Sequence, residues 1–293
     1  MDKWIQLLVT GVTMGSIYAL IALGFVTIYR TSRIVNMAQG SFVMFGALFT
    51  YSFLNESGLP FWLSGIIGTV LVVVVALLMH QVVLKPILKV SLVAMILCTV
   101  ALSLLFENLA LLQWGGYGQG LPPFTGDQSF NAGGVYVTRQ SLWVIGVMII
   151  VLIVLYLLNN RTTIGKRMTA TATNPVAASL SGVSVGKMVM LAFAISAVIG
   201  SLGGISIAWV VPISVFSGGI FGMNGFVAAV LGGWGSSSGA VVGGLVLGIA
   251  QSLSTGLVPA GYKNVVAFVI LLIVLYFRPQ GLLGTHIPEG EVR

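Results

Sequence analysis

The feature that most constrains this chain is a succession of long apolar segments separated by short polar ones. We count eight full spans and one half-span or short span (residues 220–233), since a helical crossing of a bilayer takes about 20 apolar residues. The segments are residues 4–29, 34–54, 61–84, 91–114, 140–158, 188–211, 220–233, 239–258 and 264–277. This pattern predicts an all-α polytopic membrane protein of about 8–9 helices, some short or broken, in a single transmembrane domain over residues 1–293.

The scarcity of charge excludes other classes. Charged residues make up 6% of the 293 residues, against about 25% in soluble domains, and hydrophobic residues make up 57%. Neither a soluble fold nor a disordered chain fits these values. The basic residues are scattered between apolar runs, so the net charge of +7 does not indicate nucleic-acid binding. The first apolar run is too long for a cleavable signal and is expected to stay as the first span.

The distribution of Lys and Arg predicts the orientation. If successive runs alternate, ten basic residues fall on one side of the membrane and three on the other. The larger set is Arg30, Arg33, Lys85, Lys89, Arg161, Lys166, Arg167, Lys187, Arg278 and Arg293; the smaller is Lys3, Arg139 and Lys263. The positive-inside rule then places the N-terminus outside and the C-terminus in the cytoplasm. If the short run re-enters without crossing, the bias weakens to nine against four, so a crossing is favoured.

Two connecting segments are unusually long. The external segment, residues 115–138, is rich in glycine and is interpreted either as a plug or short hairpin over the outer mouth or as a solvated loop. The cytoplasmic segment, residues 159–187, contains Asn174 before Pro175, a helix N-cap followed by proline at the first helical position. Gly182 can end that helix in the left-handed conformation. The predicted helix, residues 175–181, is either a knob that docks into another protein or a simple connector.

Glycines occur in two patterns. Pairs four residues apart, as at Gly11 and Gly15 or Gly244 and Gly248, favour close helix packing. Two further blocks combine glycine with amides, NMAQGSF at residues 36–42 and GMNGF at residues 222–226. Broken helices of an inverted repeat would bring such blocks to a solute path. The candidate pathway residues are Asn36, Gln39, Gly40, Asn224 and Gly225, although these amides could instead bond neighbouring helices.

Glu107 is a carboxylate within an apolar run, and such groups are costly and often functional. A structural or cavity-lining role is favoured over ion coupling, because no cationic partner is evident.

The sequence gives no sign of catalysis. His80 and His286 are the only histidines, and neither an HExxH nor a Walker motif is present, so no catalytic or metal-binding residues are predicted. An ATP-driven role would need a separate nucleotide-binding subunit.

Four blocks together resemble the branched-chain amino acid ABC permease family. They are GSIYALIALGF at residues 15–25 with IVNMAQG at 34–40, TTIGKRM at 162–168 with NPVAA at 174–178 and GV at 182–183, GFVAAVLGG at 225–233, and RPQGLLG at 278–284. The chain departs from the family's usual pattern at residues 168–173, where a charged residue is common, and at Met37 and Gln39, which replace the frequent Phe and His.

The resemblance implies the fold of type II ABC importer permeases and half of a translocation pathway in a bacterial plasma membrane. It makes residues 159–187 the coupling loop. Its ATPase-coupling residues are Gly165, Asn174, Pro175, Ala177, Ala178 and Gly182. The implied partners are a second related permease subunit, two ABC ATPases that bind ATP and Mg, and an external solute-binding protein. No cofactor is expected on this chain, and branched-chain amino acids or related small solutes are the expected cargo.

Three alternatives stay open on the residues alone: a secondary transporter using Glu107, a passive channel for a small neutral solute such as urea, and a structural scaffold.

Overall fold

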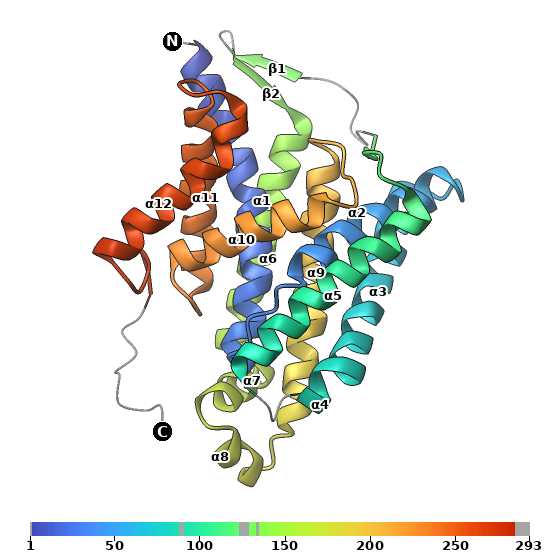
Figure 1. The fold of residues 1–293 in the computed structure, drawn as a ribbon, viewed down its shortest axis with the longest axis vertical. Helices are drawn as coiled ribbons and strands as arrows, with labels where there is room; N and C mark the ends of the chain where they lie inside the picture. Colours follow the sequence, from blue (N-terminus) through green and yellow to red (C-terminus); the bar gives the residue numbers. More distant parts are fainter. Residues whose placement is uncertain (1, 88–90, 123–128, 133–134, 285–293) are drawn as a thin grey trace.

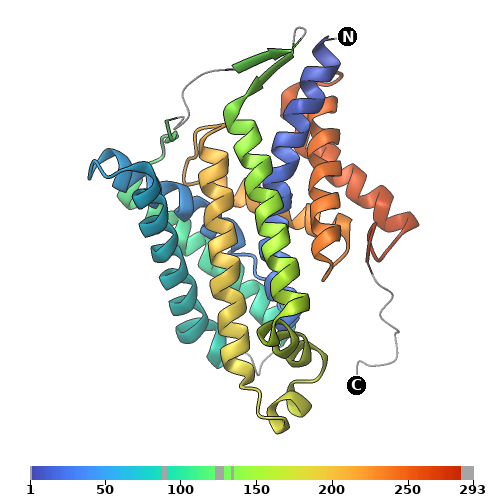
Figure 2. The ribbon, with the colours of Figure 1, turned by 180° about the vertical axis from the view of Figure 1, so that it is seen from behind.

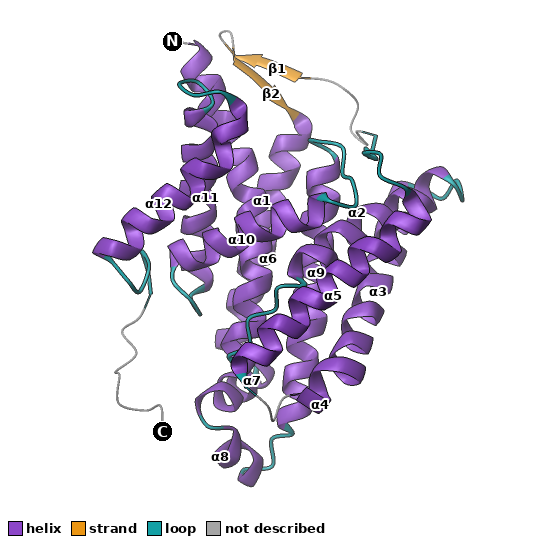
Figure 3. Cartoon of the chain, viewed as in Figure 1, coloured by secondary structure: helices purple, strands orange, loops and turns teal. Residues whose placement is uncertain are grey.

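The computed structural model describes residues 2–87, 91–122, 129–132 and 135–284. This part of the chain is a helical bundle with one small β-hairpin (Figure 1 and Figure 3). The hairpin and the N-terminus lie at one end of the bundle, and a short helix, α8 (Pro175–Leu180), lies at the opposite end. We call these two ends the hairpin end and the α8 end. Lys89, Arg293 and the C-terminal residues, whose sides were predicted, lie outside the described residues.

Six segments of the described chain are long and apolar enough to cross a membrane. They are α1 (Asp2–Ser32), α3 (Phe61–Leu78) with its π-helical continuation Met79–Leu84 and α4 (Lys85–Ile87), α5 (Leu92–Trp114), α6 (Arg139–Arg161), α9 (Val185–Ala208) and α11 (Ser237–Ser254). The prediction of an all-α polytopic membrane protein is confirmed.

Three apolar helices are shorter: α2 (Gln39–Asn55), α10 (Ser217–Gly232) and α12 (Lys263–Phe277), which follows a 3-10 turn at Ala260–Tyr262. With 15 residues, α12 is about 22 Å long, less than the ~30 Å of a bilayer core. The predicted span 34–54 is shorter than expected, because residues 33–38 are not helical and α2 begins only at Gln39. The predicted run 264–277 coincides with α12, but a helix of this length is too short for the full span that was counted.

Helix α1 forms the centre of the bundle and contacts α11, α9, α10 and α6 (Figure 1). Its middle is fully buried, from Ile17 to Leu23. Glycines bring α11 against it: a methyl group on Gly248 would overlap the backbone of Gly15, and one on Gly244 would overlap Ala19. Close helix packing, the simpler interpretation of the glycine pairs, accounts for these positions.

Helix α10 runs obliquely across the middle of the bundle, in front of α1 in Figure 1. Before it, Ile213 exchanges two backbone hydrogen bonds with Gln119, each 2.8 Å, in the segment that leads to the hairpin. After it, residues 234–238 line a cavity together with Arg30 and Arg33 at the α8 end. The full crossing of the membrane by the short run stays a prediction.

The connecting segment at residues 115–138 contains a hairpin, β1 (Ser129–Ala132) paired antiparallel with β2 (Val135–Thr138). The side chain of Gln6 on α1 holds it in place: its Nε2 donates to the carbonyl oxygen of Tyr136 at 3.0 Å, and its Oε1 accepts from the Tyr136 N–H at 2.8 Å. The hairpin interpretation of residues 115–138 is confirmed, whereas residues 123–128 and 133–134 lie outside the described chain.

Candidate functional site

The link between α1 and α2 is a fixed break. Arg33 ends α1 with a φ of +58°, in the left-handed region. The side-chain oxygen of Asn36 then accepts a hydrogen bond from the N–H of Ala38 at 3.2 Å. The N–H of Met37 donates to the hydroxyl of Thr99 on α5 at 3.1 Å, which places Met37 beside that helix. The predicted irregular backbone around residues 34–38 is present.

Gln39 joins α2 to α9 in the protein interior. Its side chain is completely buried, its Nε2 donates to the carbonyl oxygen of Ser196 at 3.2 Å, and its Oε1 accepts from the Ser196 hydroxyl at 2.7 Å. A methyl group on Gly24 of α1 would overlap the Gln39 amide. Gln39 thus bonds a neighbouring helix in this conformation.

The two predicted amide–glycine blocks meet at Gly40. This residue lies against Gly218 and Gly222 of α10, and a methyl group on it would overlap the carbonyl group of Gly218. The second block, however, lies within the continuous helix α10, so the expectation of a broken helix at residues 222–226 is wrong. Glycine there serves close helix contact rather than a change of chain direction.

Asn224 belongs to a buried polar chain between α10, α11 and α1. The hydroxyl of Tyr18 donates to Gln251 Oε1, and Gln251 Nε2 donates to Asn224 Oδ1, both at 2.8 Å. Asn224 Nδ2 donates to the carbonyl oxygen of Ile220 at 3.0 Å. The adjacent Gly225 leaves room for Ile21 of α1, which a methyl group would overlap.

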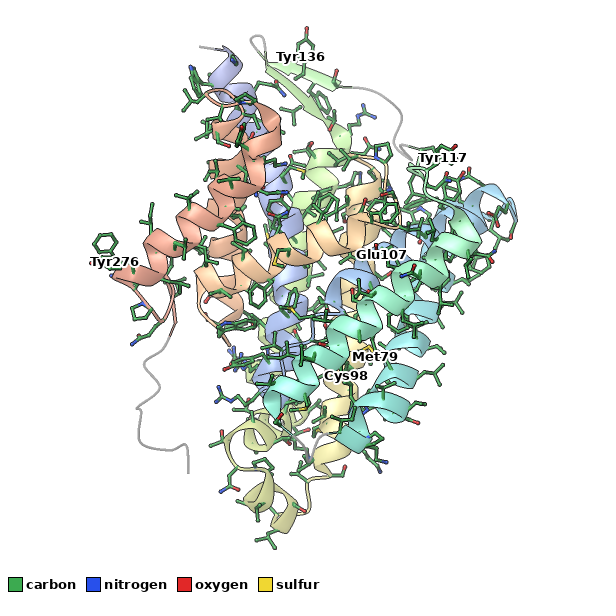
Figure 4. All side chains as sticks on the ribbon, in the orientation of Figure 1. Met79, Cys98, Glu107, Tyr117, Tyr136 and Tyr276 are labelled. Atoms are coloured by element: carbon green, nitrogen blue, oxygen red, sulfur yellow. The ribbon has the colours of Figure 1, made fainter. Side chains whose placement is uncertain are left out.

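A cavity of about 200 Å³ lies between α5 and α10, and Glu107, labelled in Figure 4, is one of its lining residues. Its wall comes from α1, the α1–α2 break, α5 and α10. The lining residues are Phe25, Met37, Val100, Ser103, Leu104, Glu107, Gly218, Gly219, Gly222, Met223 and Phe226. The cavity opens outward, because the side chains of Leu104 and Met223 are 56% and 45% exposed. Its lining is otherwise uncharged.

The structure therefore separates the six predicted pathway residues. Glu107 lines the cavity, and Gly40 packs directly behind its wall, against Gly218 and Gly222. Gln39, Asn224 and Gly225 contact neighbouring helices, whereas Asn36 is buried and its side chain accepts from the nearby Ala38 N–H. The exposure of these four residues to a solute stays a prediction. Met37, which the sequence marked only as a departure from the family pattern, and Met223, which it did not single out, also line the cavity beside the predicted residues.

The connecting segment at residues 159–187 folds into two helices, α7 (Thr163–Thr173) and α8. In α8 the side chain of Asn174 accepts from the N–H of Ala177 at 2.9 Å, Pro175 occupies the first turn, and Gly182 has a φ of +80°. The predicted capping is confirmed. Ala178 is buried, while Ala177 is exposed.

Helix α7 was not predicted, and it supports α8. Gly165 packs so closely that a methyl group would overlap the carbonyl group of Leu158 at the end of α6. Met168 and Thr171 are also buried, so one face of α7 is fixed against the bundle. The spacing of these three residues and the cap at Thr162 were the sequence signals for this helix.

The last recognisable block, residues 278–284, packs on the C-terminal end of α10. The N–H groups of Leu282 and Leu283 donate to the carbonyl oxygens of Leu231 and Gly232 at 2.8 and 2.9 Å. Gly281, with a φ of +81°, touches Gly233 so closely that a methyl group would overlap it. Two blocks far apart in sequence thus form one unit.

Membrane-length helices around a small cavity, with a capped helix projecting from one end, define a polytopic membrane transport protein. The chain belongs to the family described as branched-chain amino acid transport system / permease component, which it matches over residues 7–275. It is accordingly a permease component of a transport system.

Its curated relatives carry the same description. The chain is 28% identical to the high-affinity branched-chain amino acid transport system permease protein LivH of Escherichia coli K12, over 98% of this chain and 97% of the relative. It is equally similar, at 28% and the same coverage, to BraD of Pseudomonas aeruginosa. A probable LivH of Methanocaldococcus jannaschii is 26% identical over 92% of this chain and 89% of its own length.

Among solved structures, PsaBC from Streptococcus pneumoniae in complex with Fab aligns with 95% of this chain and 91% of its own chain, at a TM-score of 0.46 and 15% identity.

Proposed function

We propose that this chain is one permease subunit of an ATP-driven importer for branched-chain amino acids or closely related small solutes. The match to the permease family along nearly the whole chain carries the proposal. The names of its curated relatives support the solute class. The largely uncharged cavity suits a small zwitterion that passes without being held firmly, so the selectivity of the system would reside mainly in a solute-binding protein.

The cavity around Glu107 is half of the pathway in this proposal. Its ~200 Å³ is below the roughly 300–1,000 Å³ of complete ligand pockets. Its open side lies between α5 and α10, where Leu104 and Met223 are exposed. A second permease subunit, either a related chain or a second copy, would close the cavity from this side.

Helix α8 is the proposed contact with the ATPases. Val176 and Leu180 are 71% and 86% exposed on this short helix, although both are apolar. The cap at Asn174 and the support from α7 hold the helix in a fixed position. A fixed helix can transmit a movement of the ATPases to the membrane helices. Two ABC ATPase subunits would dock here and bind ATP and Mg, for which this chain carries no Walker motif.

The proposal includes the orientation of the chain in the membrane. Arg30 and Arg161 lie in the last turns of α1 and α6, Lys166 lies in α7 and Lys187 near the start of α9, and these parts of the bundle lie toward the α8 end (Figure 1). These basic residues support a cytoplasmic α8 end in a bacterial cell. The hairpin end, with the N-terminus, would face outward and receive the solute-binding protein.

Purification of the chain from its native membrane tests this composition. Mass spectrometry of the stoichiometric partners is expected to find a second permease and two ATPase subunits. A chain that purifies alone and moves solute without them would contradict the proposal in favour of a channel or a secondary carrier.

The pathway assignment is tested with single cysteines in a Cys98→Ala background. Met37→Cys and Met223→Cys are expected to react with water-soluble thiol reagents and to be shielded by leucine. Val82→Cys is the control, because it is 68% exposed on a helix remote from the cavity. Equal behaviour at all three positions would contradict a pathway between α5 and α10.

A further inference from the structure

A second and larger cavity, of about 720 Å³, lies at the α8 end. Its walls are the end of α1, the last turns of α6, the exposed side of α7 and the turn between α10 and α11. The lining residues are Arg30, Arg33, Leu152, Ile153, Tyr156, Asn159, Asn160, Thr169, Ala172, Thr173, Trp234, Gly235, Ser236, Ser237 and Ser238. None of them belongs to the cavity around Glu107. Figure 2 shows α6 on the face opposite that of α5.

The polar part of this cavity is strongly positive. Arg30 and Arg33 both line it, and its wall contains no carboxylate. In the described chain the acidic residues are Asp2, Glu56 and Glu107, all on other parts of the bundle. The guanidinium of Arg33 lies over the Tyr29 ring, with its Cζ 5.6 Å from the ring centroid. Two guanidinium groups that line one cavity without a counter-charge favour a bound anion.

Hydroxyl groups and a helix end complete the polar part. Ser236, Ser237 and Ser238 form the start of α11, an 18-residue helix whose N-terminal end carries a partial positive charge. Ser236 caps the N–H of Gly239 at 3.0 Å, and its hydroxyl lies 3.2 Å from that of Ser238. Arginine with serine hydroxyls and a helix N-terminus is the donor set that phosphate oxygens accept from.

The remaining wall is largely apolar and exposed along α6. Leu152, Ile153 and Tyr156 lie along α6, and the side chains of Ile153 and Tyr156 are 51% and 57% exposed. Trp234 lies at the same level, where aromatic side chains are typical of the membrane–water interface. A cationic polar region that continues into an exposed apolar helix face matches a molecule with a phosphate group and acyl chains.

We propose that this cavity binds the headgroup of an anionic phospholipid, with the phosphate against Arg30 and Arg33 and the acyl chains along α6. Basic pockets between transmembrane helices at a membrane surface bind such headgroups. The lipid would join α1, α6, α7 and the α10–α11 turn at the level where α8 projects. It would thereby steady the base of α8 in the membrane.

The experiment compares lipid retention in the purified complex. Arg30→Gln with Arg33→Gln removes both charges, and Arg161→Gln is the matched control, since Arg161 lies at the same end outside the cavity. Each complex is prepared from vesicles of phosphatidylcholine with phosphatidylglycerol, and the bound phosphatidylglycerol is counted by native mass spectrometry. The double variant is expected to retain about tenfold less than wild type, and the control as much as wild type.

Further arms separate the lipid from other occupants. Short-chain phosphatidylglycerol is expected to raise the unfolding temperature of wild type but not of the double variant, whereas inorganic phosphate is expected to raise neither. An equal rise with phosphate would overturn the lipid assignment. Equal lipid retention in the folded wild type and the folded double variant would also overturn it. A wild-type complex without bound lipid, because a partner subunit fills the cavity, would overturn it as well. Size-exclusion chromatography establishes that the variants are folded.

Discussion

Single buried amides hold the centre of this bundle together, because a bilayer interior offers no water to hydrogen-bond and buried polar groups depend on partners in the protein. The side-chain amide of Gln39 makes two hydrogen bonds to Ser196, one as a donor and one as an acceptor. Asn224 belongs to a chain of hydrogen bonds with Gln251 and Tyr18. The sequence identified these amides as special but did not distinguish solute contact from helix contact. That distinction depends on the direction in which each side chain points. The surrounding residues are largely apolar on all sides of the helix, so the sequence does not determine this direction.

Replacing Gln39 by Ala is expected to lower the free energy of unfolding by about 2–3 kcal/mol, because two hydrogen bonds are lost and a space opens between α2 and α9. Gln81→Ala is the matched control, since Gln81 is exposed. Thermal unfolding of both variants in the same detergent measures the difference. Equal midpoints would contradict a structural role for Gln39.

Replacing Glu107 by Gln is expected to leave ATP-dependent uptake within about twofold of wild type, because Gln keeps the shape and most hydrogen-bonding capacity while the charge is removed. Only a carrier driven by an ion gradient would need the carboxylate. Loss of uptake in Glu107→Gln, together with collapse of wild-type uptake when proton and sodium gradients are removed, would favour a secondary carrier.

At the scale of elements, the long spans were predictable because each requires only a long apolar run. The length of α2 was not, since its apolar run begins in the break between α1 and α2, which tertiary contacts fix. The extent of α12 matched its apolar run, but the helix is too short for a full crossing. Capping chemistry predicted α8 correctly at Asn174 and Gly182. Helix α7 was missed because it is polar overall and only one narrow face, at Gly165 and Met168, is buried.

Helix α8 provides the prediction at this scale. Val176→Ser with Leu180→Ser is expected to reduce the amount of ATPase that co-purifies by at least about tenfold, because two exposed apolar anchors are removed. Leu257→Ser is the control, since Leu257 is 76% exposed on the chain between α11 and α12. The unfolding temperature is expected to stay unchanged in both.

Breaking the backbone of α8 tests its rigidity. Ala178→Pro removes the hydrogen bond from the Ala178 N–H to the Asn174 carbonyl oxygen, 2.9 Å long, and is expected to uncouple or release the ATPases while membrane insertion is retained. Normal ATPase binding and uptake in this variant would rule out α8 as the coupling element.

At the scale of the whole molecule, the two ends differ in charge, and the positive-inside rule predicts their sides. In a Cys98→Ala background, a cysteine at Tyr136 is expected to react with an impermeant thiol reagent in intact cells, and one at Ser179 only after the membrane is opened. Both positions are exposed, so accessibility depends on the side alone. The reverse pattern would invert the proposed topology.

The central claim is that this permease moves its solute with energy from ATP hydrolysed by docked subunits. The direct measurement is leucine uptake into vesicles that contain the purified complex and the solute-binding protein, with ATP supplied on the α8 side. The account predicts uptake that requires ATP, persists when proton and sodium gradients are abolished, and is lost with Ala178→Pro. Uptake without ATP, or uptake that follows an ion gradient at constant ATP, would contradict it.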